Sequence, residues 1–425
     1  MHLRQKICKL YNTGALHITI GTFATKFVAF FGSIVVVRLL SKQDYGLMSY
    51  VENFYSYAFI FASMGLSNAI LRYLVIAKDK FEKEQYFHYI IKKSIFVNIG
   101  ISIILIIFSQ IITIPDNYSG ASYLIPIVAL LLPFQDLLNE ILYVIRTFFK
   151  NKLYAYAAFV SSSFLIIGRL IGAYTHGVDG VLWSRVLINI FFVFIGLIYV
   201  RKKYFMLKQV EVLPKEKRKA VSLYSLQYMI TNGFWALFML NDTFLLGLLL
   251  NDPISLADYK VAYVLPGNIS IFATAIGVFV GPYFTKNEKN IGWIQKNFKL
   301  VYFISAIVVA GASIVIAIFA KPLIYLMYGE QYLNVVLLMR VLLLAAFINS
   351  GLRYTTANLL AAMGEIKYNM IISGVGIISQ LLLDILLIPK MGAMAVAVSN
   401  CIVYFIMSVF LFVVFWNKYY RKYKR

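Results

Sequence analysis

Eleven charged residues lie inside long segments that are otherwise apolar, and these are the residues whose types could do chemistry. A charge at the centre of a membrane helix costs about 2.5–3.5 kcal/mol on insertion scales, so each is a candidate for a functional role. The basic side chains could bind an anion, and the acidic ones could bind a proton or a metal cation. The basic residues are Lys26, Arg72, Arg169, Arg185, Arg340 and Arg353, and the acidic residues are Glu52, Asp136, Glu140, Asp242 and Asp384.

Asp136 and Glu140 have the spacing best suited to cation chemistry. They are four residues apart, which puts both carboxylates on one face of a helix. Two carboxylates close together in a low-dielectric medium favour the uptake of a proton or a cation. We therefore interpret the pair as a coupling or gating site for H+ or Na+. The alternative is that Arg353 neutralises the pair.

The composition of the chain places these charges in a membrane. Of its 425 residues, 61% are hydrophobic and 14% are charged, and the mean hydropathy is +0.78. Soluble globular domains are about 45–50% apolar and about 25% charged. A helical crossing of the bilayer needs about 20 apolar residues, and barrel strands would alternate in polarity. We predict an all-α integral membrane protein, because uncharged apolar stretches of that length occur at 94–115, 220–241, 261–285, 300–320 and 391–417.

The hydropathy pattern predicts about twelve transmembrane helices in two halves of six. They are expected at 14–37, 46–76, 92–113, 121–146, 153–174, 179–200, 222–250, 258–284, 298–320, 333–362, 367–388 and 393–416. One longer, strongly basic segment separates the halves. The chain therefore divides into an N-terminal half (1–200), a basic cytoplasmic linker (201–221), a C-terminal half (222–416) and a basic cytoplasmic tail (417–425).

The distribution of basic residues predicts the orientation of the helices. Of the 40 Lys and Arg residues, 29 fall in the termini and loops on one side of the membrane and 5 fall on the other. By the positive-inside rule, both termini lie in the cytoplasm. These loop residues also account for the net charge of +22. We expect them to contact anionic membrane lipids rather than nucleic acid.

An internal repeat relates the two halves. Asp44 matches Asp258 at a shift of 214 residues, and Gly177 matches Gly392 at a shift of 215. Because six spans separate equivalent points, the halves enter the membrane in the same sense and are parallel repeats. Transporters with internal repeats place a substrate site in a central cavity between the halves and expose it to each side in turn. The repeat therefore indicates transport.

The repeat also suggests partners for individual charges. Lys26 lies near the middle of the first span and could contact an anionic substrate or pair with Asp242 on the seventh. Arg169 and Asp384 are equivalent at the 215 shift. These two residues could form a bridge or gate, or they could line the cavity separately.

The remaining charges in the spans divide by position. Arg185 has small and apolar neighbours and is expected to face the cavity, and Arg353 is a further candidate contact to an anionic substrate. Arg72 and Arg340 lie near span ends, where long basic side chains reach the interface. Glu52 has no evident partner in the sequence.

Two segments carry a family resemblance: VVVRLLSKQDYGLMSYV at 35–51, and DTFLLGLLL followed by ADYKVAYV within 242–264. Together with the twelve spans, they resemble the Wzx-type polysaccharide flippases of the multidrug/oligosaccharidyl-lipid/polysaccharide exporter superfamily. The resemblance implies alternating-access movement of a polyprenyl-diphosphate-linked oligosaccharide from the cytoplasmic to the outer leaflet of a bacterial inner membrane. Such a flippase would serve the synthesis of surface polysaccharide, such as the O-antigen of lipopolysaccharide or a capsule.

In such a flippase, the basic residues would hold the diphosphate and the acidic residues would couple or gate the transport. A polysaccharide polymerase and glycosyltransferases would be its partners. The substrate-binding residues are expected to be Lys26, Arg169, Arg185 and Arg353, and the coupling or gating residues Asp136, Glu140, Asp242 and Asp384.

Three other functions stay open. A cation-coupled multidrug exporter shares the twelve-span plan. Lipid II flippases of the superfamily typically carry two extra carboxyl-terminal spans, and a membrane glycosyltransferase or polymerase usually needs a sizeable outer loop, whereas the predicted outer loops are short. The four histidines make no ligand spacing, and Cys8 and Cys401 form no disulfide framework. We therefore expect no catalytic activity and no cofactor.

Overall fold

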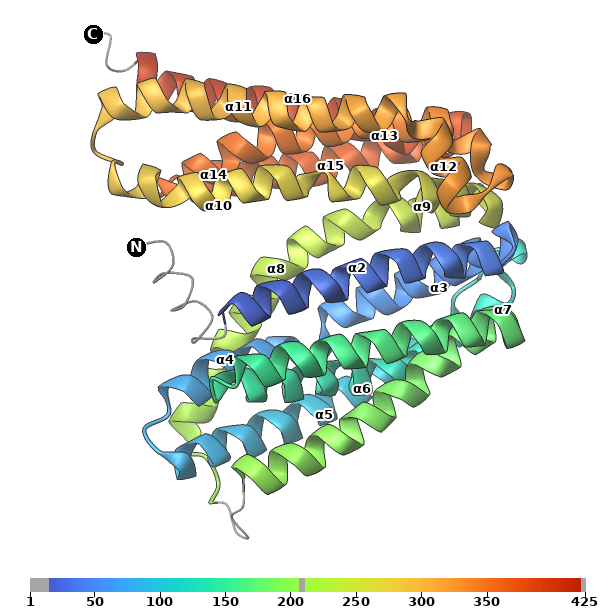
Figure 1. The fold of residues 1–425 in the computed structure, drawn as a ribbon, viewed down its shortest axis with the longest axis vertical. Helices are drawn as coiled ribbons and strands as arrows, with labels where there is room; N and C mark the ends of the chain where they lie inside the picture. The colour runs from blue at the N-terminus through green and yellow to red at the C-terminus, as the bar shows by residue number, and fades with distance from the viewer. Residues whose placement is uncertain (1–14, 206–210, 422–425) are drawn as a thin grey trace. The chain divides into compact units, whose positions relative to one another are not determined.

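The computed structural model describes residues 15–205 and 211–421, and these residues are almost entirely helical (Figure 1). No strand occurs among them. The predicted all-α membrane fold is confirmed. Contacts group the chain into two compact units, of which the first ends at Leu240 and the second begins at Asn241.

The first unit is built from long helices, one of which is interrupted and one of which turns back on itself. Helix α6 lies at its centre and packs against α3, α4, α5 and α7. The elements are α2 (Ala15–Leu39), α3 (Lys42–Ile60), the short 3-10 helix η1 (Ala62–Gly65), α4 (Leu66–Ile76), α5 (Lys80–Ile111), η2 (Asp116–Tyr118), α6 (Ala121–Thr147), α7 (Asn151–Tyr204) and α8 (Lys215–Leu250). The boundary between the units therefore lies inside α8.

The second unit is organised around α16, which packs against α9, α13, α14 and α15. Its elements are α9 (Pro253–Asn268), α10 (Ser270–Lys286), α11 (Ile291–Ile318), α12 (Ala320–Tyr328), η3 (Glu330–Val335), α13 (Val336–Phe347), the π-helical turn η4 (Ile348–Tyr354), α14 (Thr355–Ala362), α15 (Ile366–Met391), α16 (Ala393–Trp416) and η5 (Asn417–Arg421).

The helices in the described part of the chain correspond to the twelve predicted spans. Nine helices there are long and apolar enough to cross a membrane, or ten if the bent pair Pro253–Gly277 and Phe279–Lys286 is one span. Helix α7 has 54 residues, which is about 80 Å at 1.5 Å per residue, so it supplies two spans rather than one. Helix α8 contains a shorter apolar stretch, Ala236–Leu250, within the predicted span 222–250.

Part of the basic segment predicted as a linker, 201–221, is helical. Helix α7 continues to Tyr204, and α8 begins at Lys215. The Nζ atom of Lys217 lies 2.6 Å from Oε1 of Glu82 at the start of α5. This contact holds the beginning of α8 against the first unit, and the Glu82 carboxylate raises the pKa of Lys217.

Helix α7 reverses direction at Gly177, and its two arms lie close together near the turn and diverge away from it (Figure 1). Gly177 has φ 57° and ψ −133°, a backbone conformation that residues other than glycine rarely adopt. The arms then approach with their backbones in contact, because a Cβ added to Gly172 would lie 2.1 Å from the carbonyl oxygen of Gly180. Glycine is thus required both at the turn and at the contact below it.

The same turn recurs in the second unit. Gly392 separates α15 from α16 and has φ 60° and ψ −141°, nearly the conformation of Gly177. These are the two glycines that the sequence matched at a shift of 215 residues. The repeat therefore extends to the backbone torsion angles of a single residue.

Alanine at either turn should destabilise the protein. A non-glycine residue in such a conformation costs about 1–3 kcal/mol, so Gly177→Ala and Gly392→Ala should each lower the melting temperature of the purified protein in detergent. Gly374→Ala is the matched control, since Gly374 lies inside α15 with no atom within 4 Å of its added Cβ. Equal melting temperatures for all three variants would contradict this interpretation of the turns.

Candidate functional site

Three polar clusters lie inside the helical units and contain most of the charged residues singled out in the sequence. The arginine–glutamate cluster comprises Glu52, Arg169 and Arg185. The dicarboxylate cluster comprises Asp136 and Glu140 with Ser67, Ser94 and Asn98. The acidic cluster of the second unit comprises Asp242, Tyr259, Gln380, Asp384 and Asn400.

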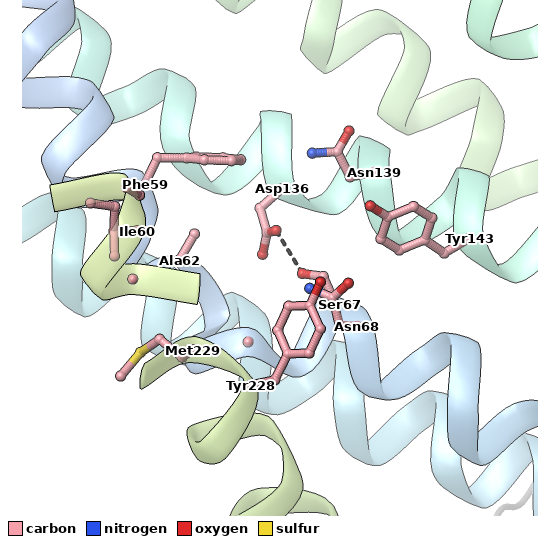
Figure 2. Close-up of a pocket in the computed structure, with 13 residues that line it drawn as sticks. Phe59, Ile60, Ala62, Ser67, Asn68, Asp136, Asn139, Tyr143, Tyr228 and Met229 are labelled. Atoms are coloured by element: carbon pink, nitrogen blue, oxygen red, sulfur yellow. Dashed lines mark hydrogen bonds between the residues drawn. The ribbon is translucent and has the colours of Figure 1, made fainter. Parts of the chain in front are cut away.

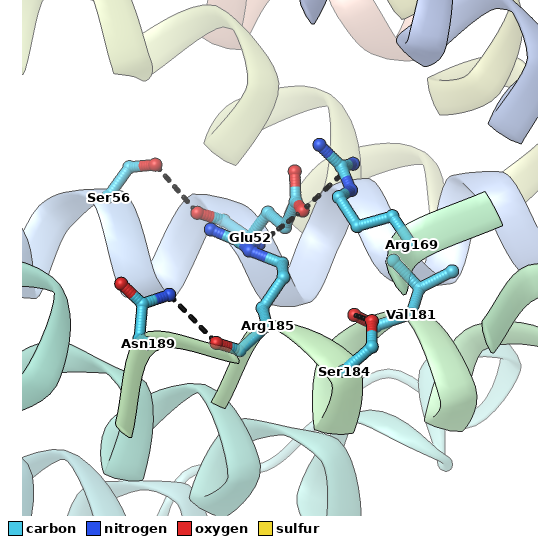
Figure 3. Close-up of polar contacts among 7 residues, drawn as sticks. All are labelled: Glu52, Ser56, Arg169, Val181, Ser184, Arg185 and Asn189. Atoms are coloured by element: carbon cyan, nitrogen blue, oxygen red, sulfur yellow. Dashed lines mark hydrogen bonds and ion pairs between the residues drawn. The ribbon is translucent and has the colours of Figure 1, made fainter. Parts of the chain in front are cut away.

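The turn of α7 assembles the arginine–glutamate cluster. Arg169 and Arg185 each lie eight residues from Gly177, so the reversal places them at the same depth on neighbouring arms. Both face Glu52 of α3 (Figure 3). Nη1 of Arg185 donates to Oε1 of Glu52 at 2.7 Å, and Nη2 of Arg169 lies 3.7 Å from the same oxygen.

This cluster carries one more positive than negative charge. The side chains of Arg169 and Arg185 are 20% and 16% exposed, so neither is fully solvated. The guanidinium of Arg185 also lies over the ring of Tyr55, 5.5 Å from its centroid. Nε of Arg169 is buried and has no acceptor among the described residues. The arrangement can therefore donate further hydrogen bonds to an anion.

Glu52 is the functional residue that sequence reasoning missed. No partner for it is evident from the sequence, and the repeat suggests Asp384 as the partner of Arg169. In the structure the acidic partner of Arg169 is Glu52. The signal available in the sequence was the equal distance of the two arginines from Gly177. A bridge from Arg169 to Asp384 would join the two units and stays a prediction.

The dicarboxylate cluster is buried in the first unit, where Asp136 is 3% exposed and Glu140 is 0% exposed. The Oγ atom of Ser67 donates to Oδ1 of Asp136 at 2.7 Å (Figure 2). Nδ2 of Asn98 and Oγ of Ser94 donate to Oδ2 of Asp136, at 2.8 and 3.3 Å. Among the described residues, neither carboxylate forms an ion pair.

A cavity of about 180 Å³ reaches this cluster from one side (Figure 2). Its polar lining includes Asp136 together with Asn68, Asn139, Tyr143 and Tyr228. All of these residues belong to the first unit. The cavity gives the buried Asp136 carboxylate a polar surrounding large enough for water.

Arg353, the predicted alternative partner of the carboxylates, is buried in the second unit. Its Nε donates to Oδ1 of Asn349 at 2.6 Å, and its guanidinium lies 6.0 Å from the ring centroid of Tyr404. A contact from Arg353 to the dicarboxylate cluster would join the two units and stays a prediction.

The acidic cluster brings together two of the predicted residues, Asp242 of α8 and Asp384 of α15. Gln380 connects them, because its Nε2 lies 3.2 Å from Oδ1 of Asp242 and 3.3 Å from Oδ2 of Asp384. Tyr259 and Asn400 donate to Oδ2 of Asp242 at 2.8 and 3.0 Å. Asp384 and Asn400 each lie eight residues from Gly392. Arg169 and Arg185 lie at the same separation from Gly177 in the first unit.

Oxygen atoms dominate this acidic cluster. Oδ1 of Asp384, Oε1 of Gln380 and Oγ of Ser399 are buried without a hydrogen-bond partner among the described residues. Two carboxylates with amide and hydroxyl oxygens form the kind of ligand set that hard cations prefer. The acidic cluster can therefore hold a proton or a small cation such as Na+.

The other basic candidates lie on exposed surfaces. Lys26 is exposed on α2, and a pair with Asp242 would join the two units and stays a prediction. Arg72 lies 4.9 Å from the ring centroid of Tyr224. Nε of Arg340 donates to the carbonyl oxygen of Ala317 at 3.1 Å.

Residues 12–288 match the family described as "Polysaccharide biosynthesis protein". The chain belongs to this family. Its predicted place in the exporter superfamily is confirmed, whereas the Wzx type within it stays a prediction. An uncharacterized membrane protein of Methanocaldococcus jannaschii is 25% identical over 426 residues, covering 90% of this chain and 79% of that protein.

Solved transporter structures share the fold of this family member. The lipid II flippase MurJ in an inward closed conformation matches with a TM-score of 0.68 and 17% identity, covering 94% of this chain and 87% of that chain. A multidrug resistance MATE family transporter in an inward-facing conformation matches with a TM-score of 0.67 and 12% identity, covering 94% and 98%. The chain is therefore a multi-pass membrane protein with the fold of these transporters.

The acidic cluster predicts cation-dependent stability. A ligand that binds only the folded state stabilises it by mass action, by about 2.7 kcal/mol at one hundred times its dissociation constant. Na+ should therefore raise the melting temperature of the detergent-purified protein, and Asp384→Asn should abolish the rise. Glu330→Gln, at an exposed carboxylate of the same unit, should keep it. A rise with acid but not with Na+ would assign the cluster to H+, and no rise with either would contradict a cation site.

Proposed function

We propose that this protein is a flippase. It moves a polyprenyl-diphosphate-linked oligosaccharide from the cytoplasmic to the outer leaflet by alternating access, for surface polysaccharide synthesis. The observation that carries the proposal is the arginine–glutamate cluster inside a membrane unit of a polysaccharide biosynthesis family member. The fold shared with a lipid II flippase supports it.

The physical task is to move a diphosphate and a glycan through a medium that disfavours charge. Guanidinium groups bind phosphate oxygens with two parallel hydrogen bonds, and such charge-assisted bonds are short and strong. Arg169 and Arg185 already point at one carboxylate oxygen. A diphosphate could replace Glu52 as their acceptor, so the partly buried arginines keep a counter-charge before and after binding. Lys26 and Arg353 are proposed as additional contacts.

We propose that an ion gradient drives the cycle through the acidic residues. Asp242 and Asp384 form one cation site in the second unit, and Asp136 and Glu140 form another in the first. The coupling ion is H+ or Na+. Each site holds two carboxylates. Because two negative charges close together in a medium of low dielectric constant are unfavourable, uptake of a cation stabilises the site.

The cellular setting follows from the proposed substrate. The protein would act in the bacterial cytoplasmic (inner) membrane with both termini in the cytoplasm, beside a polysaccharide polymerase and glycosyltransferases that use or make its substrate. The glycan would be that of an O-antigen, lipopolysaccharide or capsule. The basic loops would contact anionic lipids. The two solved structures named above as sharing the fold are a flippase and a transporter, which supports a function without catalysis.

A cation-coupled multidrug exporter is the second candidate. The fold shared with a MATE family transporter and the acidic cluster of the second unit favour it. An exporter of cationic drugs would need its acidic residues and would have little use for paired arginines in the first unit. Lipid II is a further substrate candidate.

Reconstitution in liposomes tests the proposal. A lipid-linked oligosaccharide should become accessible in the opposite leaflet in the presence of the protein, and Arg185→Gln combined with Arg169→Gln should slow this at least about tenfold, since charged hydrogen bonds contribute about 1.5–3 kcal/mol each. Arg340→Gln, which removes a basic residue outside the cluster, should leave the rate unchanged.

Two outcomes would contradict the proposal. Multidrug export without movement of the lipid-linked oligosaccharide would favour the second candidate. Consumption of the oligosaccharide donor or lengthening of its glycan by the purified protein would indicate an enzyme. Movement of lipid II alone would retain a flippase and change its substrate.

A further inference from the structure

The second span is interrupted between α3 and α4 by a turn that is unusual in a membrane helix. Ser63, Met64 and Gly65 have φ values of 47°, 48° and 77°. Non-glycine residues rarely adopt the left-handed region, and two in succession must be held there by their surroundings. Whatever holds this turn therefore controls the shape of the second span.

Hydrogen bonds from the dicarboxylate cluster hold the turn. The backbone N–H of Ser63 donates to Oδ1 of Asn98 at 2.5 Å. The hydroxyls of Ser63 and Ser67 lie 2.9 Å apart, and the Ser67 hydroxyl donates to Asp136. Asn98 also donates to Asp136 through its Nδ2. Two of the contacts that fix Ser63, those with the Asn98 amide and the Ser67 hydroxyl, thus lead to the Asp136 carboxylate.

The two carboxylates of the cluster differ in the donors they receive. Asp136 accepts from Ser67, Ser94 and Asn98. Glu140 has one hydrogen-bond contact with a recorded length, a long one of 3.4 Å from its Oε1 to Oγ of Ser67, and it also interacts with the Ser94 hydroxyl, which lies 3.3 Å from Asp136; its Oε2 is buried without a partner among the described residues. A buried ionised carboxylate without donors is costly. Asp136 is therefore suited to be ionised, and Glu140 is suited to be neutral.

The hydroxyl of Ser67 leads to the same assignment. A hydroxyl has one proton to donate, and the shorter contact directs it to Asp136. The contact between Ser67 and Glu140 is then a hydrogen bond only if Glu140 donates its own proton to the Ser67 oxygen. The hydroxyl chain from Ser63 through Ser67 to Asp136 is thus complete when Glu140 is protonated.

The titratable groups near the pair come from several elements. Tyr55 of α3 interacts electrostatically with Asp136, as does Tyr143 of α6, and Tyr228 of α8 lines the adjoining cavity. The cation near them, Arg185 of α7, faces Glu52 and the Tyr55 ring. The side chains of α4 and α5 that contact the pair are hydroxyls and an amide. In the part of the chain that the structure describes, no cationic side chain forms an ion pair with either carboxylate.

We propose that Asp136 and Glu140 form a one-proton site in which Glu140 carries the proton, and that this proton stabilises the turn in the second span. Loss of the proton would leave two negative charges that compete for the hydroxyl protons of Ser67 and Ser94, and would weaken the contacts that fix Ser63. The cavity that reaches Asp136 supplies a route for exchange with water. The proton site itself does not require the proposed flippase, but its role in coupling rests on that function.

Infrared spectroscopy of the purified protein tests the proton site directly. At neutral pH the wild type should show a carbonyl-stretching band of a protonated carboxylic acid, and Glu140→Gln should remove one component of it. Glu330→Gln, at an exposed carboxylate, should leave the band unchanged. A band identical in the wild type and Glu140→Gln would overturn the assignment of the proton to Glu140.

Hydrogen exchange tests the link to the turn. In the wild type, the backbone amide hydrogens of residues 61–68 should exchange faster at high pH, where the infrared band is lost. After correction for intrinsic exchange rates, the increase should be about five- to tenfold, because that is the change expected when one hydrogen bond is lost. Glu140→Gln should stay protected throughout that range. If the variant fails to fold, the pH titration of the wild type is sufficient by itself. Amide exchange at 61–68 that does not change when the carboxylic-acid band disappears would overturn the link between the proton and the turn.

Both measurements are made without any lipid-linked substrate. A failure to flip oligosaccharide in liposomes would therefore leave a positive result for the proton site intact. Conversely, flipping with no protonated Glu140 would refute the proton site and leave the proposed function standing.

Discussion

The constraint on which this structure depends is that a charged group buried among membrane helices must have an opposite charge or hydrogen-bond partners close to it. In both units, a helical hairpin that turns at a glycine with positive φ brings such groups together. In the first unit the hairpin brings Arg169 and Arg185 onto Glu52, and in the second it brings Asp384 and Asn400 into the cluster around Asp242. The backbone turn therefore determines which buried groups can meet.

The two hairpins have the same backbone plan and opposite polarity. Positions eight residues on either side of the turn hold two arginines in the first unit and an aspartate with an asparagine in the second. A duplicated helical frame thus presents a surplus of positive charge in the cluster at the first hairpin and of negative charge in the cluster at the second. An anionic substrate and a coupling cation need such different surroundings, so one repeated architecture can serve both parts of the proposed cycle.

The sequence predicted the helical class, the repeat and the register of the hairpins, because these depend on hydropathy and on local backbone preference. Gly177 and Gly392 were recognisable for this reason. It did not predict the contact of Glu52 with the arginines, since that depends on how far α3 is rotated about its axis against α7. The turn at Ser63 was also missed. Its support comes from Asn98 and Asp136, which are distant in sequence, so no local signal marked it.

The proposed function requires that the arginine–glutamate cluster lines a path that water and substrate can reach, and is not a sealed structural cluster. Its most direct test is thiol labelling in vesicles of a Ser56→Cys variant, made with Cys8→Ser and Cys401→Ser, since Ser56 lies one helical turn from Glu52 (Figure 3). An impermeant reagent should label this cysteine, a lipid-linked oligosaccharide should protect it, and Phe96→Cys, at an exposed apolar position of α5, should stay unlabelled in lipid. A Ser56→Cys variant that is unreactive from both sides under all conditions would contradict the account.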